Sequence, residues 1–213
     1  MKKFIIFILI LLTLLPSTAE TLFFGRYYQT YSINGAKSPV EWLILTETDD
    51  AYFLLSKYAL DANRFGSSRY PCYWANSEVR SFLNSEFLQE AFTEKEQQYI
   101  LLTNTSLGHP SKDYIFLLSI EEVKQYLTDR SAYATQFARI GHLRIIGEKW
   151  GGAATTNTGA VHWWLRNSGV DYYHAIFIAP NGTISIRGDR VSSPHFALRP
   201  ALWVNKTFFK GDK

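Results

Sequence analysis

Two short apolar runs in the C-terminal third of the chain give its clearest signal of local structure. In residues 175–179 and 183–187, isoleucines alternate with other side chains, and Asn181-Gly182 lies between the two runs. This dipeptide tolerates the positive φ angles of a tight type I′ turn, so the pattern predicts a β-hairpin. The first run is apolar on both faces, and we therefore expect the hairpin to lie inside a sheet.

Similar patterns predict three further strands in the first third of the chain. Residues 22–31 are dense in aromatic side chains and predict a strand with a bulge at Gly25. Residues 40–46 and 51–57 are apolar runs separated by four polar residues, which predicts a second hairpin. Residues 60–73 have no clear period and predict a surface loop.

Three segments carry signals for the start of a helix. Asn76 or Ser77 is suited to cap a helix that ends near Asn84, because apolar residues recur after it at helical spacing. Residues 93–96 and 119–122 match the S/T-x-x-E capping box. They predict a short helix to about residue 99 and a second helix through about residue 127.

The middle of the chain is less regular. Residues 100–105 predict a short strand, and the apolar run 114–118 predicts a strand that leads directly into the next helix. Residues 132–158 show no period and contain two adjacent glycines. Because long irregular segments in folded domains often carry function, we interpret this stretch as a candidate binding loop.

The N-terminal residues predict a secretory signal peptide. Two lysines precede twelve apolar or near-apolar residues from Phe4 to Leu15, and Pro16 ends that run. Ser17 and Ala19 fit the small positions of a cleavage site, so we expect residues 1–19 to be removed before Glu20. A membrane anchor is the alternative, but the run is shorter than the roughly 20 residues of a membrane-spanning helix. The protein is expected to be exported: periplasmic, at the cell surface or secreted.

Composition narrows the choice of partner. Loss of the two signal-peptide lysines lowers the 22 basic residues to 20, against 19 acidic residues. This balance gives no electrostatic reason to expect nucleic acid, and no membrane span is expected after cleavage. We expect residues 20–213 to form a single domain. Cys72 is the only cysteine, so it is expected to be buried and the fold to lack an internal disulfide.

Motifs for common chemistry are absent from the sequence. There is no H-E-x-x-H, C-x-x-C, G-x-S-x-G or phosphate-binding glycine loop, and the five histidines have no ligand spacing. We therefore predict neither a metal site nor a cofactor. Arg166 and Arg199 lie in apolar runs and are interpreted as structural arginines that need buried partners, with an anionic ligand as the alternative.

Polar and aromatic residues cluster on both sides of the predicted hairpin and are expected to lie close together. Such side chains on loops held by a sheet suit recognition of a peptide or sugar surface, although a plain solvated rim has the same composition. The candidate binding residues are Asp171, Tyr172, Tyr173, His174, Arg187, Asp189, Arg190 and His195.

Five motifs in order give the chain a resemblance to a large family of bacterial domains of unknown function, many of them exported. The motifs are E-W-x-x-L at 41–45, W-x-x-S-x-x-R-x-x-L-N at 74–84, F-L-L-S-x-x-E at 116–122, W-W-L-R at 163–166 and L-R-P-A-L at 198–202. The resemblance covers nearly all of residues 20–213.

This resemblance further implies a place in the C-type-lectin-like superfamily, which includes formylglycine-generating enzymes. It implies an α+β fold with antiparallel sheets, a C-terminal β-hairpin and two or three short helices. The chain lacks the W-N-D motif of calcium-dependent lectins and the cysteine pair of the formylglycine-generating enzymes. Neither activity is therefore expected.

These observations favour a non-catalytic binding module of the bacterial envelope or exterior that recognises a protein or glycan partner. The alternative is a divergent enzyme of the same superfamily in which Asp171, His174, Asp189 and His195 act as acids or bases. A concave pocket around those side chains favours the enzyme, whereas a flat aromatic surface favours the binding module. A third hypothesis is a structural envelope protein that has no binding site.

Overall fold

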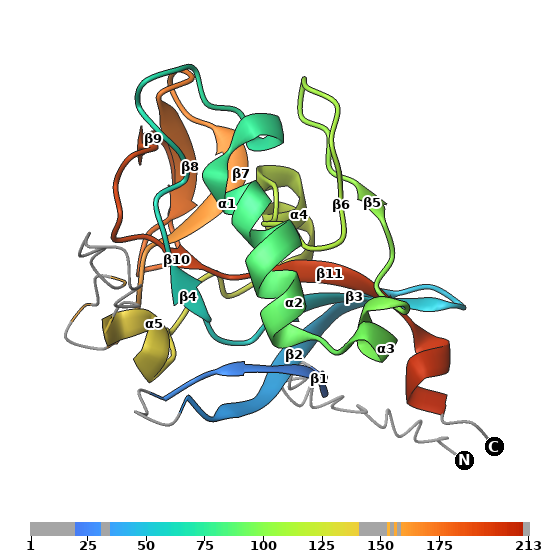
Figure 1. Cartoon of the computed structure of the whole chain (residues 1–213). Helices are drawn as coiled ribbons and strands as arrows, with labels where there is room; N and C mark the ends of the chain where they lie inside the picture. Colours follow the sequence, from blue (N-terminus) through green and yellow to red (C-terminus); the bar gives the residue numbers. More distant parts are fainter. Residues whose placement is uncertain (1–19, 31–34, 141–152, 154–155, 157–158, 211–213) are drawn as a thin grey trace, which may run out of the picture.

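The chain is a mixed α/β protein in which antiparallel strand pairs carry a few short helices (Figure 1). The computed structural model describes residues 20–30, 35–140, 153, 156 and 159–210. The predicted signal peptide, residues 1–19, lies outside this part. No helix within the described residues is long and apolar enough to cross a membrane.

Two main sheets and one small sheet form the β structure. The first has the order β1-β2-β3-β11, the second β4-β10-β7-β8-β9, and β5 pairs with β6. The bounds of the strands are β1 (Thr21–Tyr28), β2 (Lys37–Glu47), β3 (Ala51–Ser56), β4 (Asp61–Ala62), β5 (Thr103–Asn104), β6 (Lys112–Asp113), β7 (Trp163–Ser168), β8 (His174–Ile178), β9 (Ile184–Arg190), β10 (Ala197–Leu198) and β11 (Ala201–Asn205).

The first sheet confirms the strands predicted near the N-terminus. The register of β1 against β2 shifts between Phe23 and Arg26, at the predicted bulge, and Gly25 there has φ +67°. β2 and β3 form the predicted hairpin. The strand β11, almost at the other end of the chain, pairs antiparallel with β3. The first sheet therefore joins segments from both ends of the described chain.

Three helices begin where the sequence predicts them. Arg80 N donates a hydrogen bond to the cap Ser77 Oγ, and both predicted capping boxes form, at Thr93 and at Ser119. The helical bounds are Trp74–Asn76 (a 3-10 turn), α1 (Glu78–Phe82), Leu83–Phe87 (a π-helical turn), α2 (Leu88–Ala91), α3 (Glu94–Gln97), α4 (Ile120–Tyr126), α5 (Gln136–Ile140) and Lys206–Lys210 (a 3-10 turn).

The first of these helices is longer than predicted. The sequence places its end near Asn84, but the π-helical turn connects α1 to α2 and the helical path continues to Ala91. Phe87 is buried in the core, and so is Ala91. Burial of these later side chains supplies the reason for the continuation, because packing of an apolar face provides most of a helix's stability.

The C-terminal hairpin forms as predicted from β8 and β9, but its turn is not type I′. Ala179 N donates to Thr183 O, and Gly182 N donates to Ala179 O, both at 2.8 Å. Gly182 has φ +81°, whereas Asn181 has no positive φ, so the loop has three residues and ends in a left-handed glycine. A two-residue loop requires an N–H on residue 180, and Pro180 has none.

Only one strand of the hairpin, β8, lies in the interior of the sheet. β8 has β7 on one side and β9 on the other, whereas β9 is the edge strand. Ile186 of β9 is 69% exposed. The expectation that the whole hairpin is interior is therefore wrong for β9, in which no residue is fully buried.

Three irregular segments differ from the predictions. Residues 60–73 are not simply a surface loop, because Leu60 and Phe65 are buried and Leu60 N donates to Leu198 O. The run 114–118 forms only an isolated bridge, between Phe116 and Ala201, and the strand expected at 100–105 is reduced to β5. Long-range contacts that no local pattern encodes determine these segments.

The candidate binding loop at 132–158 falls largely outside the described residues. Its described first part contains the helix α5, which the sequence did not predict, with Phe137 and Ala138 buried. The positions 141–152, 154–155 and 157–158 are not described.

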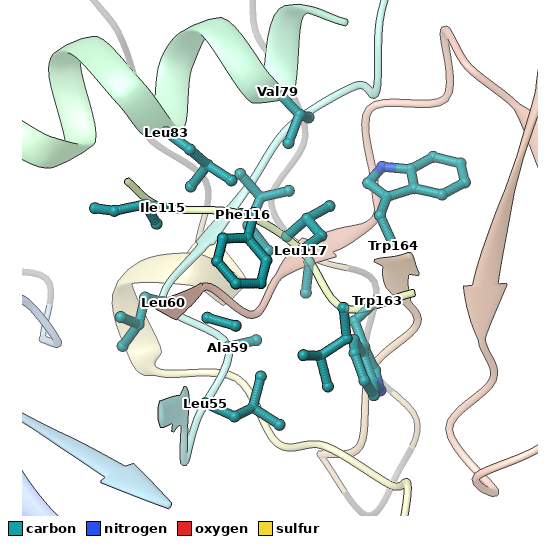
Figure 2. Packing of buried hydrophobic residues seen from close by; sticks show 14 of the residues in the cluster. Leu55, Ala59, Leu60, Val79, Leu83, Ile115, Phe116, Leu117, Trp163 and Trp164 are labelled. Carbon is teal, nitrogen blue, oxygen red and sulfur yellow. The ribbon is translucent and has the colours of Figure 1, made fainter. Parts of the chain in front are cut away.

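One hydrophobic cluster joins the two main sheets to the helical segment of residues 78–91, which comprises α1, the π-helical turn and α2. Figure 2 shows Val79 and Leu83 of that segment on the helix side of the cluster, Phe116 below them, and Trp163 and Trp164 of β7 to the right. All five side chains are fully buried. The core is thus dense in aromatic rings.

Candidate functional site

The turn between β7 and β8 carries three of the predicted binding residues, and the fourth, His174, begins β8. Nδ1 of His174 lies 2.7 Å from Asp171 Oδ1, and Tyr173 N donates to the same oxygen at 2.8 Å. The hydrogen bond from the His174 side chain and that from Tyr173 N hold the pKa of Asp171 below its ordinary value. Tyr172 is 52% exposed, so the turn is ordered and presents its aromatic ring to solvent.

The register of the hairpin places the second predicted group beside the first. His174 is paired with Arg190, and Ala175 with Asp189. Asp189 Oδ1 accepts hydrogen bonds from Arg190 N at 2.6 Å and from Ser193 Oγ at 3.0 Å. The side chain of Asp189 therefore stabilises the end of β9.

Arg187 contributes through its backbone as well as its exposed side chain. Its carbonyl accepts a hydrogen bond from Val170 N at 2.9 Å, which ties the β7–β8 turn to β9. A Cβ on Gly169 would lie 2.4 Å from this carbonyl oxygen, so only glycine fits there. His195 is exposed and has no hydrogen bond or ring contact to the other candidates within the described residues.

Two further aromatic residues, which the sequence does not indicate, form a row of rings with Tyr172. Its ring centroid is 4.5 Å from that of Tyr73, which in turn lies 3.8 Å from the imidazole of His109. Cys72 N donates to Tyr172 O at 2.7 Å and fixes the neighbouring loops. We define the aromatic rim as these three rings together with the exposed tyrosines beside them: Tyr70, Tyr73, His109, Tyr172 and Tyr173.

The rim is built from three segments that are far apart in the sequence. They are the loop before α1, the tip of the β5–β6 hairpin and the β7–β8 turn, which lie at one end of the molecule in Figure 1. No motif at Tyr73 or His109 marks them as partners of Tyr172. The only local signal is the density of tyrosine in residues 70–73.

A buried carboxylate holds the β5–β6 hairpin against the first helix. Asp113 accepts hydrogen bonds from Trp74 Nε1 at 2.9 Å and from Arg80 Nε at 2.6 Å. Thr105 Oγ1 donates to the same carboxylate and lies 2.9 Å from Ser111 Oγ. Such a fully paired buried charge fixes the base of the hairpin that carries His109.

The thiol of Cys72 is buried beneath the rim, as the sequence predicts for this residue. Burial raises the pKa of this thiol to about 11, and Glu78 contributes in the same direction. The thiol is therefore protonated at neutral pH and lacks the thiolate character of a reactive cysteine.

The two predicted structural arginines are buried and bonded within the fold. Arg166 donates to both carboxylate oxygens of Glu122 and to Leu117 O at 2.7 Å. Arg199 Nε donates to Ser56 O at 2.8 Å, and its guanidinium lies 5.2 Å from the centre of the Trp163 ring. Burial lowers the pKa of Arg199 to about 10.

The pockets of the described structure lie apart from the predicted binding residues. Two described pockets are lined by residues of α2, α3 and their surroundings, and neither contains a candidate binding residue. Within the described part of the chain, no group of three histidine, cysteine or acidic side chains is placed to hold a metal ion. His162 packs between Phe177 and Phe196, and burial lowers its pKa. His142 lies outside the described residues.

Comparison with protein families gives one match. Residues 49–206 match the family described as a domain of unknown function (DUF6273), and this range contains the whole aromatic rim and both buried arginines. No curated protein and no solved structure matches the chain.

Proposed function

The chain belongs to the DUF6273 family of domains of unknown function, and from that premise we propose that it is a non-catalytic binding module. The module is exported to the bacterial envelope or exterior and recognises a protein or glycan partner through the aromatic rim. Export rests on the charged start and the apolar run at Phe4 to Leu15. The partner contacts the β7–β8 turn and the two loops beside it.

One observation carries this proposal: rings from three separate segments meet at one end of the molecule. Tyr73 contacts both Tyr172 and His109, while Tyr70 is 73% exposed. Tyrosine supplies a large, rigid, amphipathic contact surface with few rotatable bonds, and it is enriched in binding sites for this reason. Exposed rings also suit stacking on the apolar faces of sugars. Hydrogen bonds that Asp171 accepts from Tyr173 N and Asp113 accepts from Trp74 Nε1 hold the supporting loops in place before binding.

We also propose that the fold is C-type-lectin-like. Three features support this assignment: the first and last strands share one sheet, a late β-hairpin precedes the closing strand, and L-R-P-A-L leads into β11. The assignment implies a fold and no particular ligand.

A divergent enzyme is the second candidate, because of the contact between His174 and Asp171. A carboxylate that accepts a hydrogen bond from Nδ1 fixes the imidazole so that Nε2 is left for proton transfer. Asp189 is bonded to Ser193 and to the backbone of Arg190, and His195 lies apart, so two of the four acid–base candidates do not converge on this pair. The binding module is therefore preferred.

A thermal-shift screen of the purified protein tests the proposal. The screen contains calcium, EDTA, cell-wall fragments and a glycan panel, followed by fractions of envelope protein. A ligand at a hundred times its dissociation constant stabilises the folded state by about 2.7 kcal/mol. We expect a ligand that raises the melting temperature of the wild type and not of the double variant Tyr73→Ala, Tyr172→Ala.

The matched control for this experiment is Tyr133→Ala, which removes an exposed tyrosine away from the rim. It is expected to keep the full shift. A ligand that stabilises all three proteins equally binds elsewhere and contradicts the proposed site. No stabilisation by any member of the screen favours the third hypothesis, a structural protein without a binding site.

A further inference from the structure

A second concave surface lies at the base of the β5–β6 hairpin and shares no residue with the aromatic rim. It is a pocket of about 330 Å³, which is in the range of small-ligand sites. Its walls come from α2, from α3 and its C-terminal end, and from the residue after β6. The lining residues are Leu88, Glu94, Gln97, Gln98 and Tyr114.

Hydrogen bonds between side chains and the backbone hold the walls of this pocket in place. Gln97 Nε2 donates to Phe92 O at 3.0 Å and to Leu88 O at 3.4 Å, which ties α3 to the end of α2. Tyr114 N donates to Asn84 Oδ1 at 2.9 Å. The pocket is therefore formed before any ligand binds, which lowers the entropic cost of binding.

Two side chains that line the pocket have hydrogen-bond acceptors without a partner in the described residues. Within the described residues, the Glu94 carboxylate makes no hydrogen bond or ion pair, and Gln97 Oε1 accepts no hydrogen bond. The Tyr114 ring is 40% exposed. Of the five lining residues, one is acidic and none is basic.

The neighbouring pocket lacks this property. Its charged lining residues are Lys37 and Glu90, which form a salt bridge with each other, and Arg26 and Glu96, which are hydrogen-bonded to Lys37 O and to Thr93 N. Its two basic and two acidic residues therefore balance in charge, and each of them is bonded within the protein. Of these two pockets, only the one around Tyr114 has a charged side chain that makes no hydrogen bond or ion pair within the described residues.

We propose that the pocket around Tyr114 binds a ligand that carries a protonated primary amine. The ammonium group donates hydrogen bonds to the Glu94 carboxylate and to Gln97 Oε1, and it lies over the face of the Tyr114 ring. Leu88 contacts the carbon skeleton of the ligand. This chemistry has two sources outside a cell, an amino sugar and the lysine side chain of a peptide.

A titration followed by ¹H–¹⁵N NMR tests this inference with the purified protein. The probes are butylamine hydrochloride, glucosamine and a short lysine peptide, all at pH 6, and the neutral match of glucosamine is N-acetylglucosamine. We expect saturable shifts of the side-chain amide signals of Gln97 and Gln98. We expect Glu94→Gln to weaken binding of the charged probes about tenfold, because it removes a hydrogen bond between charged groups.

The control variant is Glu86→Gln, which removes an exposed acid on the π-helical turn outside the pocket lining. It is expected to bind as the wild type does. Glu94→Gln leaves the Thr93 capping box intact, so loss of binding is not loss of fold. Tighter binding of glucosamine supports the amino-sugar source, and tighter binding of the lysine peptide supports the peptide source.

Two results overturn the inference. One is the absence of saturable shifts at about 10 mM probe, where even millimolar affinity gives high occupancy. The other is equal binding of glucosamine and N-acetylglucosamine, which shows that the positive charge is not recognised. Neither result affects the aromatic rim, because the two sites share no side chain.

Discussion

The strand β7 and the turn that follows it differ in the burial and hydrogen bonding of their polar side chains. At Arg166 the guanidinium is buried and bonded to Glu122 and to a backbone carbonyl. Six residues later, Tyr172 presents half of its surface to solvent and contacts only neighbouring rings and backbone. The buried segment bonds its guanidinium to a carboxylate and a carbonyl within the fold, whereas the turn leaves its aromatic surface open to solvent. This contrast separates stability from binding.

The largest predicted loss of stability is for substitution of Arg166, on the buried strand β7. Replacement of Arg166 by alanine leaves the partly buried Glu122 without its partner and frees Leu117 O. We expect a loss of about 3 kcal/mol or more in the free energy of unfolding, measured by urea denaturation. Arg187→Ala, which truncates an exposed arginine on β9, is expected to change stability by about 0.5 kcal/mol or less. Equal effects of the two substitutions contradict the structural role of Arg166.

An intermediate loss of stability is predicted for substitution of Gly169, where the β7–β8 turn contacts β9. A methyl group at Gly169 would lie 2.4 Å from Arg187 O, so the backbone must move and the hydrogen bond from Val170 N weakens. We expect Gly169→Ala to destabilise the fold by about 1–3 kcal/mol and to displace Tyr172. Val170→Ala, at an exposed neighbouring position, is the control for stability. If Gly169→Ala leaves both the melting temperature and the rim signals unchanged, the close approach is not a constraint.

The smallest effect concerns pH at the exposed turn. The pKa of Asp171 is lowered in the folded state, so its contribution to stability is present above the ordinary aspartate pKa. That contribution is lost as the pH falls through the lowered value. We expect His174→Gln to raise the pKa of Asp171 towards its ordinary value, as measured by NMR titration of the carboxyl group. An unchanged pKa in this variant means that the contact between the two side chains is absent in solution.

The sequence predicts elements that depend on neighbouring residues and misses features that depend on distant ones. The capping boxes at Thr93 and Ser119 form because their hydrogen bonds span only three residues. The hairpin forms for a similar reason, although the missing N–H of Pro180 changes its turn. The burial of Leu60 depends on Leu198, which no local pattern reveals.

The same limit applies to the candidate site. Asp171 and His174 are three residues apart, and the hairpin register places Asp189 and Arg190 beside them, so this part follows from the sequence. The contacts of Tyr73 with Tyr172 and with His109 depend on the packing of three loops. Buried groups such as Asp113 determine that packing, and the sequence alone does not identify their partners.

The most direct test of the separation between stability and binding is a paired measurement on the double variant Tyr73→Ala, Tyr172→Ala. Its free energy of unfolding and its binding to a glycan array and to immobilised envelope fractions are compared with those of the wild type and of Tyr133→Ala. We predict a stability close to that of the Tyr133→Ala control, together with loss of a binding signal that the control retains. Wild-type binding by the double variant would contradict the claim that the aromatic rim is the recognition surface.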